Sequence, residues 1–164
     1  MAKVLIVYYG GKLSAVRRMA IKIAEGVREE GVEAVLKSLE EAKVDDLLAA
    51  DGIVIGAPSY YGGVPGEMKS FLDQATKLQG KLDGKVGAAF SSSQYLGGGN
   101  ETTLLAIITT LLFHGVVIQG DSGGYHFGPI TLNPTGREDD IVESDEHQCR
   151  RLGQRVARLV KKLG

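Results

Sequence analysis

Glycines and possible phosphate contacts stand together in the stretch YYGGKLSAVRRMA, residues 8–20. This stretch follows the apolar run 4–7 and leads into an amphipathic helical pattern. A strand that turns through glycines into a helix directs unpaired backbone N–H groups, and the positive end of the helix dipole, towards an anion. The loop is therefore a candidate phosphate site, and its candidate residues are Gly11, Lys12, Leu13, Ser14, Ala15 and Val16.

The side chains of this loop are unusual for a phosphate site. Such turns usually carry Ser or Thr hydroxyls aimed at the anion, but Gly11, Leu13 and Val16 stand where hydroxyls are expected. Only Ser14 offers one. The cations that could compensate with charge are Lys12, Arg17 and Arg18. A Walker-type nucleotide loop is a poor match for GGKLS, because the GxxxxGK[ST] spacing is absent.

Two further glycine-rich loops carry polar and aromatic residues, PSYYGGV at 58–64 and SSSQYLGGGN at 91–100. Their tyrosines, Tyr60, Tyr61 and Tyr95, could stack on a planar ring. Both loops follow apolar runs, as the loop after residue 9 does, whereas the connections at the other ends of these runs are short and charged. This asymmetry favours a ligand crevice over ordinary turns.

The elements that must position these loops are short apolar strands alternating with amphipathic helices. The patterns predict strands at 3–9, 32–39, 53–57, 86–90 and 116–118. They predict helices at 14–30 and 101–113, a helix with Pro65 as its first residue, a helical turn at 44–50 and a C-terminal helix marked by Cys149, Leu152, Val156, Leu159 and Leu163. We expect the stretch 120–140 to be irregular.

Strands alternating with helices of this length need crossover connections, and these give a mostly parallel sheet that is covered on both faces. We therefore predict a doubly wound α/β domain with five strands, and we expect the strand order 2-1-3-4-5, a common one for such sheets. In such a sheet ligands bind beyond the carboxyl ends of the strands, where the strand order reverses. The ends of the first, third and fourth strands are neighbours in this order, so the three glycine-rich loops would line one crevice.

The composition limits the possible functions. The chain has 164 residues, of which 43% are hydrophobic and 24% charged, as expected for one globular domain spanning 1–164. The 19 basic residues are balanced by 20 acidic ones, which argues against a nucleic-acid partner. The single cysteine and the lack of an apolar run of membrane-spanning length favour a cytoplasmic protein without a membrane segment.

Most single titratable residues have an ordinary interpretation. Cys149 follows the apolar stripe of the last helix and is expected to fill the core. No His, Cys and Asp grouping has the spacing of metal ligands, so no metal is predicted. His114 closes an apolar helix, where it could cap the last carbonyls or take part in function, and both interpretations stay open.

Three segments resemble a known family. PSYYGGVPGEMKSFLDQ, FSSSQYLGGGNETT and LLFHGVVI are similar to segments of the flavodoxin-like NAD(P)H:quinone oxidoreductases of the WrbA type. The resemblance extends over nearly the whole chain, including its start, MAKVLIVYY. It implies a flavodoxin-like three-layer α/β/α fold, a non-covalent FMN, a homodimer or homotetramer, and two-electron reduction of quinones by NAD(P)H.

The resemblance also implies roles for particular residues. His114 matches a histidine that lies beside the flavin in this family, which makes it the candidate catalytic residue. The loop 58–64 would edge the isoalloxazine ring, and backbone amides of the loop 91–100 would cover its other side. The cofactor-binding residues implied in these two loops are Ser59, Tyr60, Tyr61, Gly62, Ser92, Ser93, Gln94, Tyr95, Leu96, Gly97 and Gly98.

The phosphate loop departs from the family, whose pattern there carries several hydroxyls. A hydrogen bond to a charged group contributes on the order of 1.5 to 3 kcal/mol, so losing two or three could weaken FMN binding by several powers of ten. Ser14 also stands where the family has glycine. Two alternatives to an FMN enzyme therefore remain: a flavodoxin-type electron carrier, which the net charge of -1 supports little, and a scaffold that has lost FMN.

Overall fold

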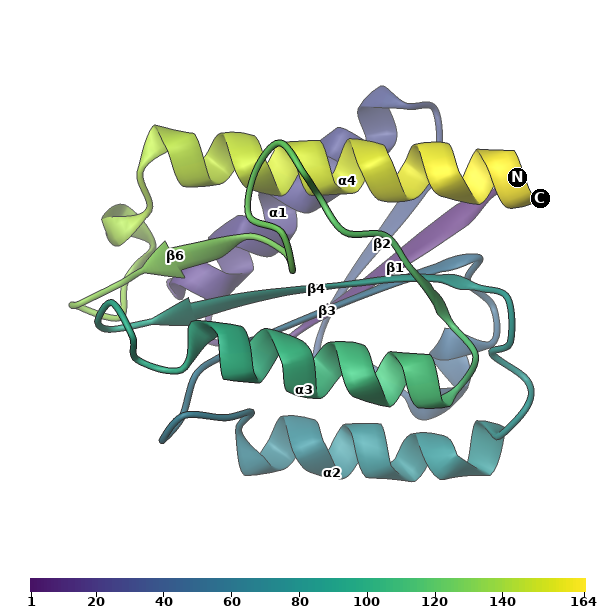
Figure 1. Cartoon of the computed structure of the whole chain (residues 1–164), viewed down its shortest axis with the longest axis horizontal. Helices are drawn as coiled ribbons and strands as arrows, with labels where there is room; N and C mark the ends of the chain where they lie inside the picture. The colour runs from purple at the N-terminus through teal and green to yellow at the C-terminus, as the bar shows by residue number, and fades with distance from the viewer.

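Six parallel strands form one sheet at the centre of the computed structural model, which describes residues 1–164 (Figure 1). The main path runs β2-β1-β3-β4-β5, which confirms the predicted order and the flavodoxin-like class. The strand bounds are β1 Lys3–Tyr8, β2 Glu33–Ser38, β3 Gly52–Pro58, β4 Val86–Ser93, β5 Val117–Ile118 and β6 Ile130–Leu132.

Four α-helices cover the two faces of this sheet (Figure 1). The helices α1, Ala15–Glu29, and α4, Glu143–Leu163, pack on one face, and α2, Gly66–Gln74, and α3, Asn100–Phe113, pack on the other. Short 3₁₀ helices complete the chain: η1 Val44–Leu47, η2 Ala75–Leu78 and η3 Glu138–Asp140. None of the helices is both long enough and apolar enough to cross a membrane.

The apolar runs of the central strands fill a core on each side of the sheet. Along β1, Val4 and Ile6 lie in the cluster under α1 and α4, while Leu5 and Val7 lie in the cluster under α2 and α3. Each cluster contains 19 buried residues, so neither face of the central sheet is left open. This is why the strands read as continuous apolar runs in the sequence instead of alternating patterns.

The strand β6 lies inside 120–140, so the expectation of an irregular stretch was wrong there. Its residues pair in parallel with Ser91–Ser93 of β4, while β5 pairs only with the first two residues of β4. Because β3 occupies the other edge of β4, β5 and β6 share one edge and divide the fifth position of the sheet. The three residues of β6 are too few to show periodicity, which is why the sequence did not reveal it.

Two predicted boundaries also need correction. Pro65 is not the first helical residue, because it adopts an extended conformation as the N-cap before Gly66. β4 continues beyond Phe90 to Ser93, through three buried serines that an apolar pattern does not include. This extension carries β4 to the rim of the cavity described below.

Candidate functional site

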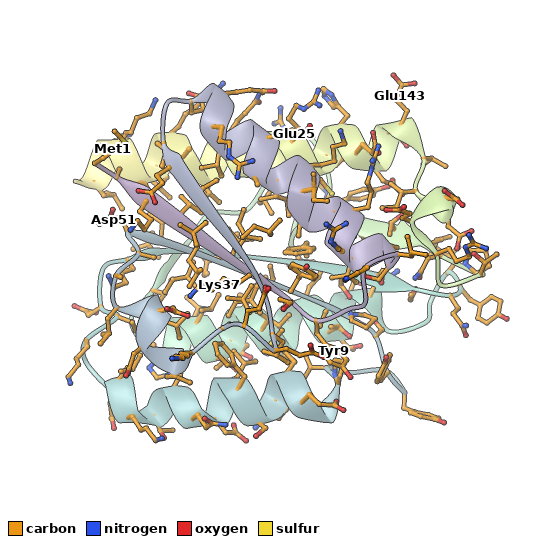
Figure 2. The ribbon with its side chains drawn as sticks, turned by 180° about the vertical axis from the view of Figure 1, so that it is seen from behind. Met1, Tyr9, Glu25, Lys37, Asp51 and Glu143 are labelled. Atoms are coloured by element: carbon orange, nitrogen blue, oxygen red, sulfur yellow. The ribbon has the colours of Figure 1, made fainter.

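A cavity of about 630 Å³ lies at the carboxyl end of the sheet, within the range usual for small-molecule sites. Figure 2 shows Tyr9 at this end of β1, away from Met1 and Asp51. We call this cavity the crevice. Its lining residues come from the three glycine-rich loops and from the chain after β6: Tyr9, Gly10, Gly11, Ser14, Ala15, Val16, Pro58, Ser59, Tyr60, Tyr61, Gly62, Ser92, Ser93, Gln94, Tyr95, Gly98, Asn133 and Gly136.

The structure brings most of the candidate binding residues together in this crevice. Four of them lie in the same loops but do not line it, namely Lys12, Leu13, Leu96 and Gly97. The side chains of Leu13 and Leu96 are exposed to solvent, at 62% and 85%. Two lining residues, Asn133 and Gly136, escaped the sequence analysis because they follow the unrecognised strand β6.

The beginning of α1 provides the backbone of an anion site. The N–H groups of Ala15 and Val16 have no acceptor within the chain, as expected for the first residues of a helix. The hydroxyl of Ser14 caps the helix by accepting the Arg17 N–H at 3.2 Å. A Cβ at Gly10 would collide with the Ser14 side chain, so Ser14 is folded against Gly10. The Ser14 oxygen thus satisfies the Arg17 N–H, and the Ser14 O–H can still donate to a ligand.

The cations near this loop differ in their availability. Arg18 is bound to Glu146 of α4, with 2.7 Å between Nε and Oε1. Arg17 donates to the Lys12 carbonyl at 3.2 Å, and neither Arg17 nor Lys12 forms an ion pair within the chain. Lys12 and Arg17 are therefore the two loop cations whose charge remains uncompensated near the start of α1.

Hydrogen bonds fix the other two loops on the rim. The Thr103 hydroxyl of α3 donates to Ser59 Oγ at 2.9 Å, and the Ser91 hydroxyl donates to the Ala57 carbonyl at 2.9 Å. The Ser93 hydroxyl donates to the Tyr95 carbonyl at 2.8 Å. The serines at the ends of β3 and β4 thus fix the backbone of the loops 58–64 and 91–100.

Close backbone contact joins the loop 58–64 to the loop 91–100. A Cβ at Gly99 would lie 2.6 Å from the Cα of Gly62, and both glycines have positive φ, at 96° and 82°. The Thr102 hydroxyl donates to the Gly62 carbonyl at 2.6 Å. Only glycine permits this approach at Gly99, so the two loops form one continuous edge of the crevice.

Aromatic side chains surround the mouth of the crevice. Tyr9 and Tyr60 meet edge to face, with ring centroids 6.2 Å apart and an interplanar angle of 77°. Burial raises the pKa of Tyr9, and the nearby carboxylate of Glu67 raises it further, so the phenol stays protonated and able to donate. Tyr60 and Tyr95 are 50% and 68% exposed, which leaves apolar ring surface available to a planar molecule.

His114 lies away from the crevice of its own chain. It follows the last residue of α3, which begins beside the crevice and runs for 14 residues, a length of about 21 Å. The chain then enters β5, whose Val117 pairs with Val86 at the start of β4, at the opposite end of the sheet. The His114 side chain is buried and meets the exposed Phe113 ring edge to face, and its Nδ1 has no hydrogen-bond partner.

The other cavities are less suited to a phosphorylated ring compound than the crevice. One of about 540 Å³ at the amino end of the sheet is lined by the two chain ends, and one of about 1070 Å³ lies between η1 and α2, where charged side chains of both signs surround it. No group of three or more His, Cys, Asp or Glu side chains is arranged to hold a metal ion. The crevice is the hollow that combines free backbone donors, polar side chains and aromatic rings.

The crevice suits a ligand that joins a planar ring to a phosphate. The unpaired N–H groups of Ala15 and Val16 fit an anion, and the tyrosines at the mouth fit a ring. Ser92 adds a polar atom without a partner, because its side chain is fully buried and its Oγ makes no hydrogen bond within the chain. The residues that are present therefore fit FMN, although loop hydroxyls are few.

Comparisons with known proteins agree with this geometry. The model of the family described as NADPH-dependent FMN reductase matches residues 30–126, more than half of the chain. An NAD(P)H dehydrogenase (quinone) of Nitrobacter winogradskyi is 41% identical over 198 residues, covering 99% of this chain and 99% of that protein. A flavodoxin of Aquifex aeolicus is 38% identical over 168 residues, covering 98% of this chain and 88% of that protein.

A solved structure gives the same assignment. The WrbA-like flavodoxin from Agrobacterium tumefaciens superposes with a TM-score of 0.81 and 28% sequence identity, covering 100% of both chains. The matched family, the full-length relatives and the shared fold all concern flavin proteins. The chain therefore belongs to the NADPH-dependent FMN reductase family, in its flavodoxin-like, WrbA-type branch, and its cofactor is FMN.

Proposed function

We propose that the protein is an FMN-dependent enzyme that reduces quinones with NAD(P)H. The observation that carries this proposal is the open mouth of the crevice, where Tyr60 and Tyr95 leave ring surface exposed beside the expected flavin position. A planar nicotinamide or quinone can enter there and stack. The quinone dehydrogenase of Nitrobacter winogradskyi, 41% identical, supports the same reaction.

The side chains of the crevice would bind FMN and orient the substrates beside it. When bound, FMN supplies the redox chemistry, taking two electrons from the nicotinamide nucleotide and passing them to the quinone. The start of α1 would hold the phosphate through the N–H groups of Ala15 and Val16, which have no acceptor within the chain. The joined edge at Gly62 and Gly99 would lie along the ring, and Tyr60 and Tyr95 would flank the open mouth. In this arrangement the protein contributes position and electrostatics, and no side-chain acid of the same chain is required.

A role for His114 requires a second subunit. Within one chain the length of α3 keeps His114 at the far end of the sheet from the crevice. We propose that the protein forms a homodimer or homotetramer, in which His114 of one subunit lies near the crevice of another. The exposed apolar residues at the end of α3, among them Leu112 and Phe113, support such an association.

Flavin absorption and nucleotide oxidation test this function. We expect the purified protein, after incubation with FMN and gel filtration, to show a flavin absorption band and to oxidise NADH or NADPH steadily only when a quinone is added. A protein that binds FMN but needs a separate reductase to become reduced would be an electron carrier instead. A protein without flavin absorption, even after incubation, would be a scaffold that has lost the cofactor.

A further inference from the structure

The sheet register places two polar side chains on the same face as α1. Ser92 of β4 pairs with Thr131 of β6, and paired residues of parallel strands point to the same face. The Thr131 hydroxyl donates to Asp145 of α4 at 2.7 Å, so this face is the one that α1 and α4 cover. Asn133 lies two residues after Thr131, and its N–H donates to the Ser93 carbonyl at 2.8 Å, which continues the pairing. Ser92 and Asn133 therefore both lie on the side of α1.

Neither side chain has a hydrogen-bond partner within the chain. Ser92 is fully buried with an unpaired Oγ, and Asn133 is only 8% exposed. The hydroxyls of Thr131 and Thr135 both donate to carboxylates, whereas the Asn133 amide makes no side-chain hydrogen bond within the chain. A buried polar group without a partner costs about 1 to 3 kcal/mol, so the buried Ser92 Oγ, together with an Asn133 side chain that lines the same crevice, indicates a place where a ligand binds.

The segment after β6 is tied to the phosphate loop. The N–H of Glu138 donates to the Leu13 carbonyl at 2.9 Å, and Arg137 forms an antiparallel bridge with Ser14. Asn133 precedes these contacts by a tight turn, in which the Gly136 N–H donates to the Asn133 carbonyl at 2.8 Å. These contacts keep Asn133 in the same cavity as the first residues of α1.

We propose that the side-chain amide of Asn133, assisted by the Ser92 hydroxyl, binds the phosphate of the cofactor. Both groups take over hydrogen bonds that the loop 11–16 lacks, because Leu13 and Val16 carry no hydroxyl. The Asn133 amide supplies two N–H donors, the Ser92 hydroxyl one more, and α1 adds its backbone donors and its dipole. This inference rests on the proposed FMN site and assigns the phosphate contacts within it.

The test compares two variants and two ligands. Asn133→Ala removes the amide, and Thr135→Ala removes a hydroxyl from the same segment that does not line the crevice. Apoprotein is titrated with FMN and with riboflavin, which lacks the phosphate, and the flavin fluorescence is followed. We expect Asn133→Ala to raise the Kd for FMN at least about tenfold and to leave the Kd for riboflavin within twofold. Thr135→Ala should leave both values unchanged.

Several results would overturn the assignment. An unchanged Kd for FMN in Asn133→Ala shows that the amide makes no contact with the phosphate. Equal weakening of FMN and riboflavin, or equal weakening by Thr135→Ala, shows that the segment only shapes the crevice. Thermal unfolding of both variants without ligand controls for folding, since a loss of ligand-free stability confined to Asn133→Ala would also mark a structural role.

A second measurement separates this inference from the proposed function. Inorganic phosphate is added to the ligand-free protein, and the shift in Tm is recorded for wild type and Asn133→Ala. If wild type binds no FMN but phosphate raises its Tm in a manner that depends on Asn133, the anion site stands and the flavin function fails. If wild type binds FMN with no contribution from Asn133, the function stands and this assignment fails.

Discussion

Val16 and Leu13 look alike in the sequence pattern, but the structure places their side chains differently. Both stand where a phosphate loop usually carries a hydroxyl, yet Val16 is 2% exposed and lines the crevice, while Leu13 is 62% exposed and does not. The turn before α1, closed by the Ser14 N–H donating to the Gly11 carbonyl at 3.1 Å, separates them. Only position 16 is placed to restore a lost contact.

Replacing Val16 by Thr should tighten FMN binding, because the new hydroxyl lies next to the free N–H groups at the start of α1. We expect the Kd to fall about tenfold, and the free energy of unfolding to drop by about 1 kcal/mol because a hydroxyl is added to the packed site. Leu13→Thr is the matched control and should change neither value. Fluorescence titration and urea denaturation measure the two effects, and equal tightening by both variants would contradict the placement of the loop.

The prediction that Cys149 fills the core is confirmed, because its side chain is fully buried between α4 and the sheet. Burial raises the pKa of its thiol far above the ordinary range, and the carboxylates of Asp145 and Glu146 raise it further. We expect native protein at pH 8 to react with iodoacetamide at least about a hundredfold more slowly than protein unfolded in urea. Mass spectrometry counts the modified fraction, and rapid labelling of the native protein would show that α4 opens readily.

At the scale of elements, one carboxylate joins the chain before β6 to α4. Arg151 donates to both oxygens of Asp121, at 2.6 and 2.9 Å, and the Gly123 N–H donates to it at 2.9 Å. These hydrogen bonds, with Arg155 nearby, hold the pKa of Asp121 well below its usual value. The loop that leads to β6, and hence to Asn133, is fixed by this contact.

Asp121→Asn should destabilise the protein in a pH-dependent way. A carboxyl whose pKa is lower in the folded state stabilises that state above its unfolded pKa of about 3.9, and this contribution is lost as the pH falls further towards the folded pKa. We expect the variant to lose about 1 to 2 kcal/mol of unfolding free energy at pH 7, and the difference from wild type to shrink below about pH 4.

Urea denaturation at pH 7, 5 and 3 measures this difference. Asp139→Asn serves as the control, because its ion pair with Arg137 is exposed and long, at 3.8 Å, and should contribute little at any pH. A difference between wild type and Asp121→Asn that stays constant down to pH 3 would rule out the carboxylate charge as the cause.

At the scale of the whole molecule, apolar side chains gather at the end of α3. Leu112 is 53% exposed, Phe113 79% and the following Val117 40%. Single exposed apolar residues are ordinary, but neighbouring ones suggest an interface. The proposed oligomer and the proposed role of His114 both depend on this surface, because a closed assembly uses the same patch on every subunit.

Phe113→Ser should therefore shift the protein towards monomers, since it removes the most exposed of these side chains. We expect sedimentation velocity at micromolar concentration to show a homodimer or homotetramer for wild type and a smaller species for the variant. Leu163→Ser, at an exposed leucine near the end of α4, is the control and should leave the assembly intact. A monomeric wild type would remove both the oligomer and the role of His114.

Much of the architecture could be predicted because it depends on local pattern. The apolar runs of β1, β3 and β4, the helical spacing of α1 and the glycines after each strand are properties of neighbouring residues, so the doubly wound α/β class follows from them. The order 2-1-3-4-5, which the structure confirms, is a common order of such sheets and brings the three loops together. The sequence also predicted a phosphate site with few hydroxyls at the loop 11–16. The sequence could not predict where the side chains of that loop point: Leu13 is exposed to solvent, whereas Ser14 is folded against Gly10.

The sequence by itself thus determined the fold class, the position of the crevice and its general chemistry, since these depend on periodicity and composition over short segments. Only the tertiary structure decided that β6 completes the sheet edge, that Asn133 joins the crevice and that His114 lies away from it. Each of these depends on pairing or packing between residues far apart in the chain. No local pattern records such contacts, because their free energy arises only when the chain has folded.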